Sequence, residues 1–428
     1  MHRTMTVGRL IRMPGAMSDQ YQRAISEISR RSAASSGFVA DPFLDESALE
    51  RGLLRTRALF DALQSPDKHL RIIHVAGSKG KGSTATFLAN MLTDAGKRTG
   101  LTTSPHFHTY RERMTINGQT ITPDDFARVA RPVLDAASRI EEMRPELGQV
   151  SAFETLIGMS LVYFVDEVCD FAVVEVGLGG RFDATNVLSP AVCVITTLEL
   201  EHTEILGASL QEIAWNKGGI IKPGLPVVSS SQPPEALLVL EDIAGSREAR
   251  LLVGGRDWRW RGTSADFTFA NGQGIIKHLA IQMPGAQQVE NATTAVATVS
   301  QLAGKGLPPD PDAIRSGLGR TALPGRFETV EFQGRRIVLD GAHTPGSARL
   351  LVEALREIGI DDPVVIAGFL KDKDITTLVQ ILGSISGRLL LAPVDSPRGA
   401  TVAELTLVAA ETAGETTAVF PAISPVKS

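Results

Sequence analysis

From residue 72 onward, short uninterrupted apolar runs alternate with longer stretches in which apolar residues recur every three or four positions. The short runs predict strands that are buried on both faces of a parallel sheet, and the longer stretches predict the helices that cover it. We predict strands at 72–76, 98–103, 171–176, 191–196 and 225–229. We predict helices at 21–31, 86–92, 123–140, 153–164 and 290–302. The pattern indicates an α/β fold, with a mostly parallel sheet and helices on both of its faces.

The pattern also divides the chain into parts. Residues 251–283 form short segments with many turns, which is typical of an antiparallel patch, and the Gly- and Pro-rich residues 304–311 are the strongest linker candidate. Beyond the linker we predict strands at 336–340, 363–368 and 388–393 and helices at 347–358, 375–382 and 402–413. The predicted parts are an N-terminal extension and helix (1–37), a central nucleotide-binding domain (38–303), the linker (304–311) and a smaller Rossmann-like domain (312–428).

Composition narrows the class of protein. The 428 residues are 43% hydrophobic and 21% charged, which is ample material for a buried core, and the net charge of −5 shows no basic excess for a nucleic-acid partner. No apolar run reaches the ~18–20 residues of a membrane span. Residues 1–17 lack the apolar core of a secretion signal, and Cys169 and Cys193 stand within apolar runs, as expected of buried thiols in a reducing compartment. We therefore expect a cytoplasmic protein.

A glycine-rich segment between a predicted strand and a predicted helix carries the first chemical signal. Residues 77–83 read Gly-Ser-Lys-Gly-Lys-Gly-Ser. Such a loop turns backbone N–H groups toward phosphate oxygens, the helix N-terminus adds a partial positive charge, and Lys81 adds a full one. The spacing departs from the common phosphate loop, because Gly82 separates Lys81 from Ser83. We predict a site for ATP or GTP; a turn that binds nothing is the alternative.

Three further polar residues stand in unusual places. Glu175 lies within an apolar strand, where a carboxylate must be paired, protonated or bound to a cation such as Mg²⁺. A buried ion pair with an arginine is the alternative. His202 follows another predicted strand, although a lone histidine is more often a packing or surface residue. Lys217 precedes two glycines and an apolar pair, which is unusual for a lysine on a solvated surface. The alternative is an exposed lysine that stabilises the C-terminal end of a helix.

Seven motifs then occur in the order found in one family. They are GSKGKGST, TSPHF with RERMTING, EVGLGGRFDATN, EHTEILG, IAWNKGGIIKPG, LPGRFE and LDGAHTPGSARLL. On these motifs the chain resembles the folylpolyglutamate synthase/dihydrofolate synthase family of the Mur ligase superfamily, from about residue 21 to about residue 420.

The resemblance implies a ligase that uses ATP to join L-glutamate to a carboxylate. ATP phosphorylates the γ-carboxylate of a folate, or the benzoate carboxylate of dihydropteroate, and the amine of glutamate displaces phosphate. The implied cofactors are ATP and Mg²⁺, with two ions expected, and the implied partners are these small molecules. The protein is expected to be a monomer. Which of the two acceptors is used, and the length of the polyglutamate product, stay open.

The resemblance also implies a role for individual residues. The phosphate-binding loop comprises Gly77, Ser78, Lys79, Gly80, Lys81, Gly82 and Ser83. The other implied ATP contacts are Asn291, Arg326, Asp340 and His343. The implied metal ligands are Ser104, Glu175, His202 and Lys217, the last of them carbamylated. The implied folate contacts are Pro105, His106, Phe153, Arg181 and Asp183. The residues expected to act in catalysis are Lys81, Lys217, His202 and Arg326.

The sequence departs from the family pattern at several positions. Glu201 stands before His202 where Asp is usual, Thr344 replaces the usual Asn of DGAHNP, and Lys79 replaces a commoner Asn. The family also continues past the region of residue 420, so the last sheet is expected to lack a strand and the glutamate pocket to be altered. These departures leave three alternatives to the folate ligase: a Mur-type ligase for a non-folate carboxylate, a degenerate nucleotide-binding homologue, and a motor-like NTPase.

Overall fold

The structure is a computed structural model, and it describes residues 19–34, 46–302, 310–412 and 417–419 of the 428-residue chain. The predicted extension up to residue 17 and the residues 420–428 lie outside the described residues. The chain divides into two compact units. The first comprises Met1–Gln282 and Gln288–Thr321, and the second comprises Met283–Gln287 and Ala322–Ser428. The chain therefore passes between the two units more than once.

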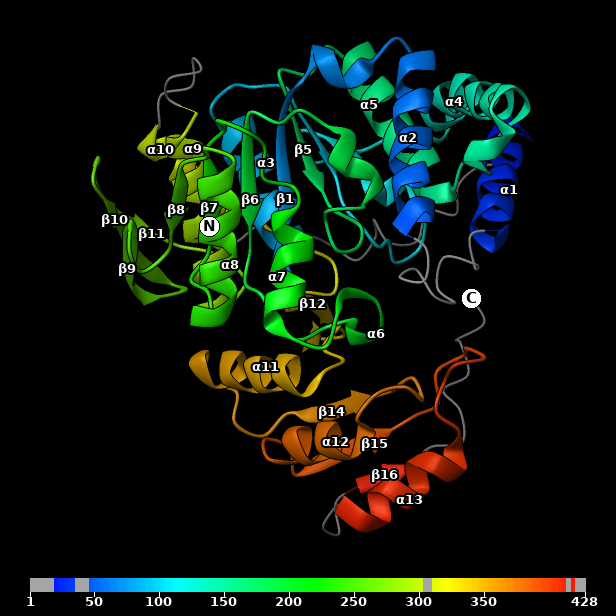
Figure 1. Cartoon of the computed structure of the whole chain (residues 1–428). Helices are drawn as coiled ribbons and strands as arrows, with labels where there is room; N and C mark the ends of the chain where they lie inside the picture. The colour runs from blue at the N-terminus through cyan, green and yellow to red at the C-terminus, as the bar shows by residue number, and fades with distance from the viewer. Residues whose placement is uncertain (1–18, 35–45, 303–309, 413–416, 420–428) are drawn as a thin grey trace. The chain divides into compact units, whose positions relative to one another are not determined.

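The first unit is built around an eight-stranded sheet in the order β4-β3-β2-β5-β1-β6-β7-β8 (Figure 1). The strands are β1 Arg71–Ala76, β2 Thr99–Thr102, β3 Met114–Ile116, β4 Gln119–Thr120, β5 Phe171–Glu175, β6 Val192–Ile195, β7 Val227–Ser229 and β8 Leu251–Val253. All pair in parallel except β3 and β4, which add an antiparallel edge. Val75 pairs with both Glu175 and Val194, so β1, β5 and β6 end at the same carboxyl edge. The predicted fold class is confirmed.

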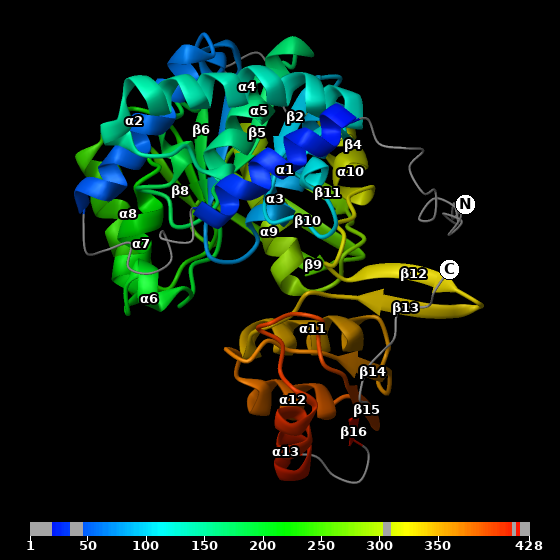
Figure 2. The same cartoon turned by 90° about the vertical axis from the view of Figure 1, so that its right-hand side faces the viewer.

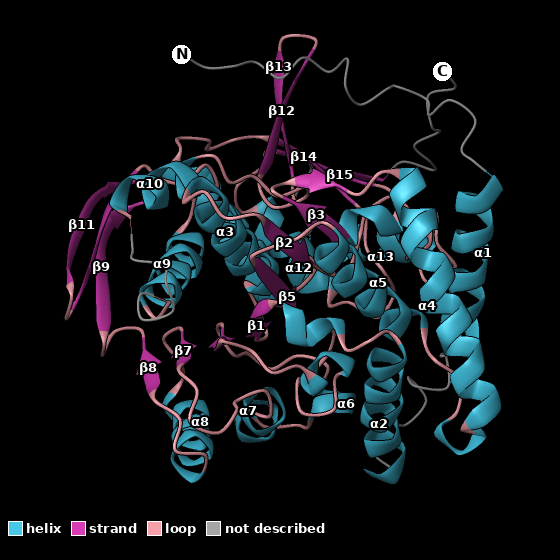
Figure 3. Ribbon diagram, turned by 90° about the horizontal axis from the view of Figure 1, so that it is seen from above, coloured by secondary structure: helices cyan, strands magenta, loops and turns pink. Residues whose placement is uncertain are grey.

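Helices cover both faces of this sheet. The helices are α1 Asp19–Ala34, α2 Glu46–Ala62, α3 Lys81–Asp94, α4 Pro123–Met143, α5 Ala152–Asp166, α6 Thr203–Leu206, α7 Leu210–Gly218, α8 Pro234–Ser246, α9 Ala286–Ser300 and α10 Pro311–Gly319. Short 3₁₀ helices are η3 Pro66–His69, η4 Tyr110–Arg113, η5 Pro145–Leu147 and η6 Ala184–Val187. Figure 3 shows α3, α9 and α10 on one side of the sheet and α2, α5, α7 and α8 on the other. Ile72 and Val174 of the sheet pack in one core cluster with Phe126 of α4 and Phe164 of α5. Cys169 and Cys193 are buried and free.

An antiparallel sheet in the order β11-β10-β9 follows β8 in the chain. Its strands are β9 Trp258–Thr263, β10 Asp266–Asn271 and β11 Gly274–Leu279. They account for the antiparallel patch predicted at 251–283, except that β8, at its start, joins the large parallel sheet.

The first unit ends after Thr321, which is beyond the linker predicted at 304–311. Residues 304–309 lie outside the described part of the chain. The reason for the later boundary is that α10 and the turn after it bind to α3. Asn90 Nδ2 donates to Thr321 Oγ1 at 2.7 Å, and Arg320 Nε donates to Asp94 at 2.9 Å. Helix α10 thus belongs to the first unit, whereas the sequence prediction assigns most of it to the second domain.

The second unit contains a hairpin and a small parallel sheet. The hairpin is β12 (Glu328–Phe332) and β13 (Arg335–Leu339), and Figure 2 shows it in yellow. The parallel sheet has the order β14-β15-β16, with β14 Val364–Ala367, β15 Arg388–Leu391 and β16 Thr417–Val419. The helices are α11 Pro345–Glu357, α12 Ile375–Gly383 and α13 Val402–Thr412. The strand predicted at 336–340 therefore exists, but in the described residues it pairs only with β12.

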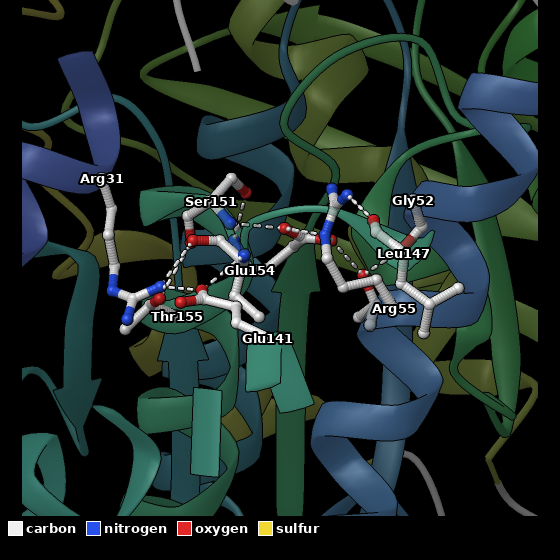
Figure 4. A network of polar contacts seen from close by, with 10 residues as sticks. Arg31, Gly52, Arg55, Glu141, Leu147, Ser151, Glu154 and Thr155 are labelled. Atoms are coloured by element: carbon white, nitrogen blue, oxygen red, sulfur yellow. Dashed lines mark hydrogen bonds and ion pairs between the residues drawn. The ribbon is translucent and has the colours of Figure 1, made fainter. Parts of the chain in front are cut away.

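The helical layer formed by α1, α2, α4 and α5 contains buried ion pairs (Figure 4). Arg55 Nε lies 3.0 Å from both carboxylate oxygens of Glu154, and Arg55 Nη1 donates to Leu147 O at 2.8 Å. Glu154 also accepts from the Ser151 backbone N–H at 2.6 Å, which caps α5. Nearby, Arg31 Nη1 donates to Glu141 Oε1 at 2.5 Å. These contacts join α2 to α5 and α1 to α4, and we call this group of residues the helical-layer network.

Candidate active site

The loop between β1 and α3 has the conformation that the glycine-rich sequence predicts. Gly77 has φ 147° and Gly80 has φ 84°, and both values favour glycine. A Cβ at Gly77 would lie 1.8 Å from Thr196 Oγ1, and a Cβ at Gly80 would lie 2.0 Å from Asn291 Oδ1. Helix α3 begins at Lys81, directly after the loop. The loop therefore needs glycine at both positions, and it leads into a helix N-terminus that can receive phosphate.

The loop is fixed to the segment that follows β6. The backbone N–H groups of Ser78 and Lys79 both donate to Thr197 O, at 3.0 and 3.1 Å. Ser78 Oγ also donates to Glu199 O at 3.0 Å. The loop thus lies at the carboxyl edge of the parallel sheet, where α/β proteins bind their ligands. Of the other residues assigned to the nucleotide, Ser83 lies buried in the first turn of α3.

Two lysines converge on one carbonyl oxygen of this loop. Lys81 Nζ donates to Gly77 O at 2.8 Å, and Lys217 Nζ donates to the same oxygen at 2.9 Å. Two ammonium groups bound to one atom repel each other strongly, because little water separates them. An anion such as a triphosphate would relieve this repulsion. Helix α7, which ends at Gly218, brings Lys217 to this point.

Glu201 supplies the negative charge for this pair. Its Oε1 accepts from Lys217 Nζ at 2.8 Å, and the two side chains are 15% and 1% exposed. Burial and, after it, the charge of Lys81 lower the pKa of Lys217 to about 8, although Glu201 opposes both effects. Although burial alone would raise it, the pKa of Glu201 lies below its ordinary value because Lys217 and Lys81 are close. The departure from the family's Asp at this position thus places a carboxylate in direct contact with Lys217.

Glu175 reaches the same place from the end of β5. It is 5% exposed, and its Oε2 accepts from the Ser104 backbone N–H at 2.9 Å. A Cβ at Gly82 would lie 3.6 Å from Glu175 Oε2, so the carboxylate stands beside the first turn of α3. Ser104 and Glu175 are therefore brought together next to the phosphate loop.

The predicted metal set is only partly assembled. His202 is exposed, has φ 46° and stands at the N-terminus of the short helix α6. Lys217 donates hydrogen bonds in this structure, and an ammonium group cannot ligate a cation. Within the described residues, no three His, Cys, Asp or Glu side chains gather as a group that could hold a metal ion. The assignment of Ser104, Glu175, His202 and Lys217 stays a prediction.

The residues assigned to folate lie in two groups. In the first, His106 follows Pro105, and its Nδ1 accepts from Arg113 Nε at 2.9 Å. Burial lowers the pKa of Arg113, and Tyr110 and Glu175 oppose this shift. Sequence reasoning quoted Arg113 within its motif but gave it no role. The arginine of the RERM motif, close enough to Glu175 to interact with its charge, was the signal that could have found it.

The second group surrounds the turn after β5. A Cβ at Gly177 would lie 2.6 Å from the Phe153 ring, so Phe153 packs directly on the turn. The Arg181 guanidinium lies 3.6 Å from the centroid of the Trp215 ring, which is 43% exposed. Asp183 is 8% exposed and binds backbone groups of the turn. Trp215, which no sequence argument singled out, therefore forms a surface with Arg181.

The remaining predicted residues divide between the units. In the first unit, Asn291 lies beside Gly80, as described above, and its Oδ1 has no hydrogen-bond partner among the described residues. In the second unit, Asp340 accepts from the Phe327 and Ala342 backbone N–H groups, both at 2.8 Å. The charges of Arg326 and His343 both act on Asp340, so these three predicted residues gather around the turn after β13.

Thr344, another departure from the family pattern, has a clear local role. It is the N-terminal cap of α11, and its side chain accepts from the Ser347 backbone N–H at 3.3 Å. Threonine is a good substitute for asparagine at such a cap, because each offers an oxygen to the first helical turn. The Asp340 carboxylate binds the turn before the helix rather than the helix N-terminus.

Comparisons with known proteins find relatives that match most of the chain. The profile of the Mur ligase middle domain matches residues 75–299, and that of the Mur ligase glutamate ligase domain matches residues 325–424. A dihydrofolate synthase/folylpolyglutamate synthase of Bacillus subtilis is 32% identical over 83% of this chain and 84% of its own length.

Solved structures show the same likeness. The crystal structure of a folylpolyglutamate synthase from Thermotoga maritima is 33% identical with a TM-score of 0.77, covering 86% of each chain. A solved FPGS-AMPPCP-folate complex is 29% identical with a TM-score of 0.78, covering 94% of this chain and 96% of its own. No helix among the described residues is long and apolar enough to cross a membrane.

Proposed function

Because the chain belongs to the folylpolyglutamate synthase/dihydrofolate synthase family of Mur ligases, we propose that it joins L-glutamate to the γ-carboxylate of a folate at the expense of ATP. The observation that carries this proposal is the convergence of Lys81 and Lys217 on Gly77 O beside a glycine-rich loop. This arrangement concentrates positive charge where a transferring phosphoryl group needs it.

The reaction has two steps. A carboxylate oxygen of the folate attacks the γ-phosphorus of ATP, and ADP leaves, so that an acyl phosphate forms. The amine of glutamate then attacks the acyl carbon, phosphate leaves, and the amine loses a proton. In the first step the backbone N–H groups at the N-terminus of α3 and the ammonium group of Lys81 hold the phosphates and the charge that develops on them.

Mg²⁺ is the metal that the side chains near the loop fit best. Of the residues assigned to the metal, Ser104 and Glu175 offer oxygen atoms, which suit this hard cation. The ion, when bound, neutralises charge on the phosphate oxygens during transfer. Glu175 is anchored for this role by the hydrogen bond from the Ser104 backbone.

Lys217 fits the metal site only after chemical change. Its pKa of about 8 leaves part of the population as the neutral amine near neutral pH. A neutral amine can attack CO₂ and lose a proton to form a carbamate, whose oxygens can ligate a cation. We include this modification in the proposal, and we assign Glu201 the role of holding the unmodified Lys217 in place.

The second unit has its own part in the proposed function. Arg326, Asp340 and His343 form a polar group at the turn after β13, and the matching family domain is the glutamate ligase domain. We propose that this group binds ATP and that Arg326 contributes to phosphoryl transfer. The protein is expected to be a cytoplasmic monomer that acts on small molecules. Gel filtration at micromolar concentration would test whether it is a monomer.

A single assay tests the function. Purified protein is given Mg-ATP and L-glutamate, and phosphate release is measured with tetrahydrofolate, with dihydropteroate or with no acceptor. Glutamate-dependent release with tetrahydrofolate supports the folate ligase, and release with dihydropteroate adds dihydrofolate synthesis. No stimulation by either acceptor would exclude both, and would leave a ligase for a non-folate carboxylate or a homologue without activity.

A further inference from the structure

A chain of buried hydrogen bonds runs from the central strand β1 to the turn after Glu175. His74 Nε2 lies 2.8 Å from Thr185 Oγ1, and Thr185 Oγ1 donates to Asp183 Oδ1 at 2.5 Å. His74 and Thr185 are fully buried, and Asp183 is 8% exposed. The reaction proposed above uses neither His74 nor Thr185, so their buried polar atoms need another explanation.

The hydrogen atoms along this chain have one consistent arrangement. Thr185 has a single hydroxyl hydrogen and gives it to Asp183, so its oxygen must accept from His74 Nε2–H. The other ring nitrogen, His74 Nδ1, has no hydrogen-bond partner in the described part of the chain. Burial lowers the pKa of His74 to about 3, and the charge of Lys222 adds to this shift. The ring is therefore neutral and fixed in one tautomer.

The carboxylate at the end of the chain fastens the turn. Asp183 Oδ2 accepts from the Leu178 backbone N–H at 3.0 Å, and Oδ1 accepts from the Thr185 backbone N–H at 2.9 Å. The nearby Gly177 backbone N–H also favours the charged form of this carboxylate and so opposes the rise of the Asp183 pKa that burial causes. Asp183 thus joins the glycine turn 177–180 to η6, and Thr185 holds one carboxylate oxygen from both its backbone and its side chain.

The fastened turn contacts elements of the proposed site on two sides. The Phe153 ring packs against Gly177. On the other side, the Arg181 backbone N–H donates to Asn216 O at 2.7 Å, and a Cβ at Gly180 would lie 2.9 Å from Lys217 O. A shift of the turn would therefore move both Phe153 and the end of α7.

We infer that His74 and Thr185 are positioning residues, which act through Asp183 to hold the turn 177–181 in the shape that the acceptor site needs. This role rests on the proposed function, because the acceptor is the folate. We call the hydrogen-bonded chain from His74 through Thr185 to Asp183 the relay. Loss of the relay should weaken binding of the folate acceptor but not of ATP, because the phosphate loop keeps its own hydrogen bonds to Thr197.

The first test removes the hydroxyl group and keeps the shape. For Thr185→Val we expect the KM of the folate acceptor to rise about tenfold or more, the value of one charge-assisted hydrogen bond, with the KM of ATP changed less than about twofold. Thr185→Ser restores the hydroxyl and should return the acceptor KM to near its original value. Thr298→Val is the matched control, because Thr298 is equally buried and donates only to its own helix at Thr294 O.

A double variant tests whether the two residues act in series. If they do, His74→Leu combined with Thr185→Val raises the acceptor KM no more than the worse single variant. His74→Gln, which offers an amide N–H near the position of Nε2, should lie closer to the original enzyme than His74→Leu. Additive effects of the two substitutions, or equal rises in both KM values, would overturn the relay.

Amide hydrogen exchange keeps the test independent of activity. Thr185→Val should speed exchange at Leu178 about tenfold and leave the segment Gly77–Gly82 unchanged. Unchanged exchange at Leu178 overturns the inference even if the enzyme is an active folate ligase. Faster exchange there, in a protein that no folate stimulates, would support the relay as a device that holds the turn and would contradict only the proposed function.

Discussion

Two regions of the first unit bury charged side chains, and they balance those charges differently. In the helical-layer network, each arginine meets a glutamate: Arg55 binds both oxygens of Glu154, and Arg31 binds Glu141 (Figure 4). At the carboxyl edge of the sheet, two lysines donate to one carbonyl oxygen, and within the described ranges one carboxylate, that of Glu201, contacts one of them.

The difference separates stability from function. Glu154 accepts from Arg55, from the Thr56 hydroxyl at 2.8 Å and from the Ser151 backbone, so its acceptor sites are taken up within the layer. Such a network holds helices together and gains nothing from a ligand. The sheet edge instead keeps like charges close together, and a bound anion would lower its free energy. We therefore expect the lysines at the carboxyl edge of the sheet to contribute to ligand binding, and the helical-layer network to contribute to the stability of the fold.

The largest expected effect comes from breaking the sheet edge at Lys217. We expect Lys217→Ala to lower kcat by about 10²–10³-fold or more, because it removes a positive group, or its carbamate, from the site of phosphoryl transfer. Because Lys217 is 1% exposed and pairs with Glu201, its loss should also lower the melting temperature, so kcat is compared per folded molecule. Steady-state phosphate release and thermal unfolding measure the two effects.

Two controls sharpen the Lys217 result. Lys222→Met removes a half-buried lysine, which binds Asn186 instead of the loop, and it should affect stability more than kcat. Adding a short carboxylic acid to Lys217→Ala should restore part of the turnover if the carbamate is the active form. Full activity of Lys217→Ala would contradict the assignment of this edge to catalysis.

The next effect comes from the helical-layer network. Glu154→Gln keeps the shape but leaves Arg55, which is 15% exposed, without its counter-charge. We expect the free energy of unfolding to fall by about 3 kcal/mol, with kcat per folded molecule unchanged. Urea unfolding measures the first quantity. A large loss of kcat in fully folded protein would show that the two regions are not separate.

The sequence predicted those parts of the molecule that depend on local signals. The strand, glycine loop and helix at residues 72–92 could be predicted because apolar runs and glycines specify them within one short segment. The hairpin of β12 and β13 was missed because strand pairing depends on the partner: Gln333 and Gly334, both with positive φ, form the tight turn that brings β12 beside β13.

The candidate site shows the same limit. Glycine, lysine and buried-acid patterns singled out Lys81, Glu175 and Lys217 separately. That Lys217 binds Gly77 O, 140 residues away, is a property of the fold and leaves no periodic trace in the sequence. His74 and Thr185 were missed because a histidine and a threonine within apolar or glycine-rich motifs do not reveal which atoms they bind.

A smaller effect comes from His74, in the central strand β1, and it depends on pH. Its pKa is about 3 in the folded protein and 6.5 ordinarily, so the unfolded chain binds the proton first as the pH falls. The contribution of His74 to the free energy of unfolding is therefore complete above pH 6.5. It is lost between pH 6.5 and about pH 3, by about 1.4 kcal/mol per pH unit, because the unfolded chain binds a proton that the buried ring does not. Urea unfolding at several pH values should show that the free energy of unfolding depends less steeply on pH in His74→Gln than in the original protein. Equal slopes for the two proteins would contradict a buried neutral ring.

The smallest expected effect tests whether burial, rather than the number of ion pairs, distinguishes the helical-layer network. Arg128 and Asp166 form a pair of the same chemical type at 2.5 Å, but the side chains are 45% and 42% exposed. Water already solvates both charges there, so Asp166→Asn should change the free energy of unfolding by less than about 0.5 kcal/mol, and added salt should remove even that difference. Glu154→Gln, measured beside it, should keep most of its effect in salt because Arg55 and Glu154 are only 15% and 3% exposed. If the two substitutions cost the same, the network would owe nothing to its burial, and the contrast with the sheet edge would have to rest on the converging lysines alone.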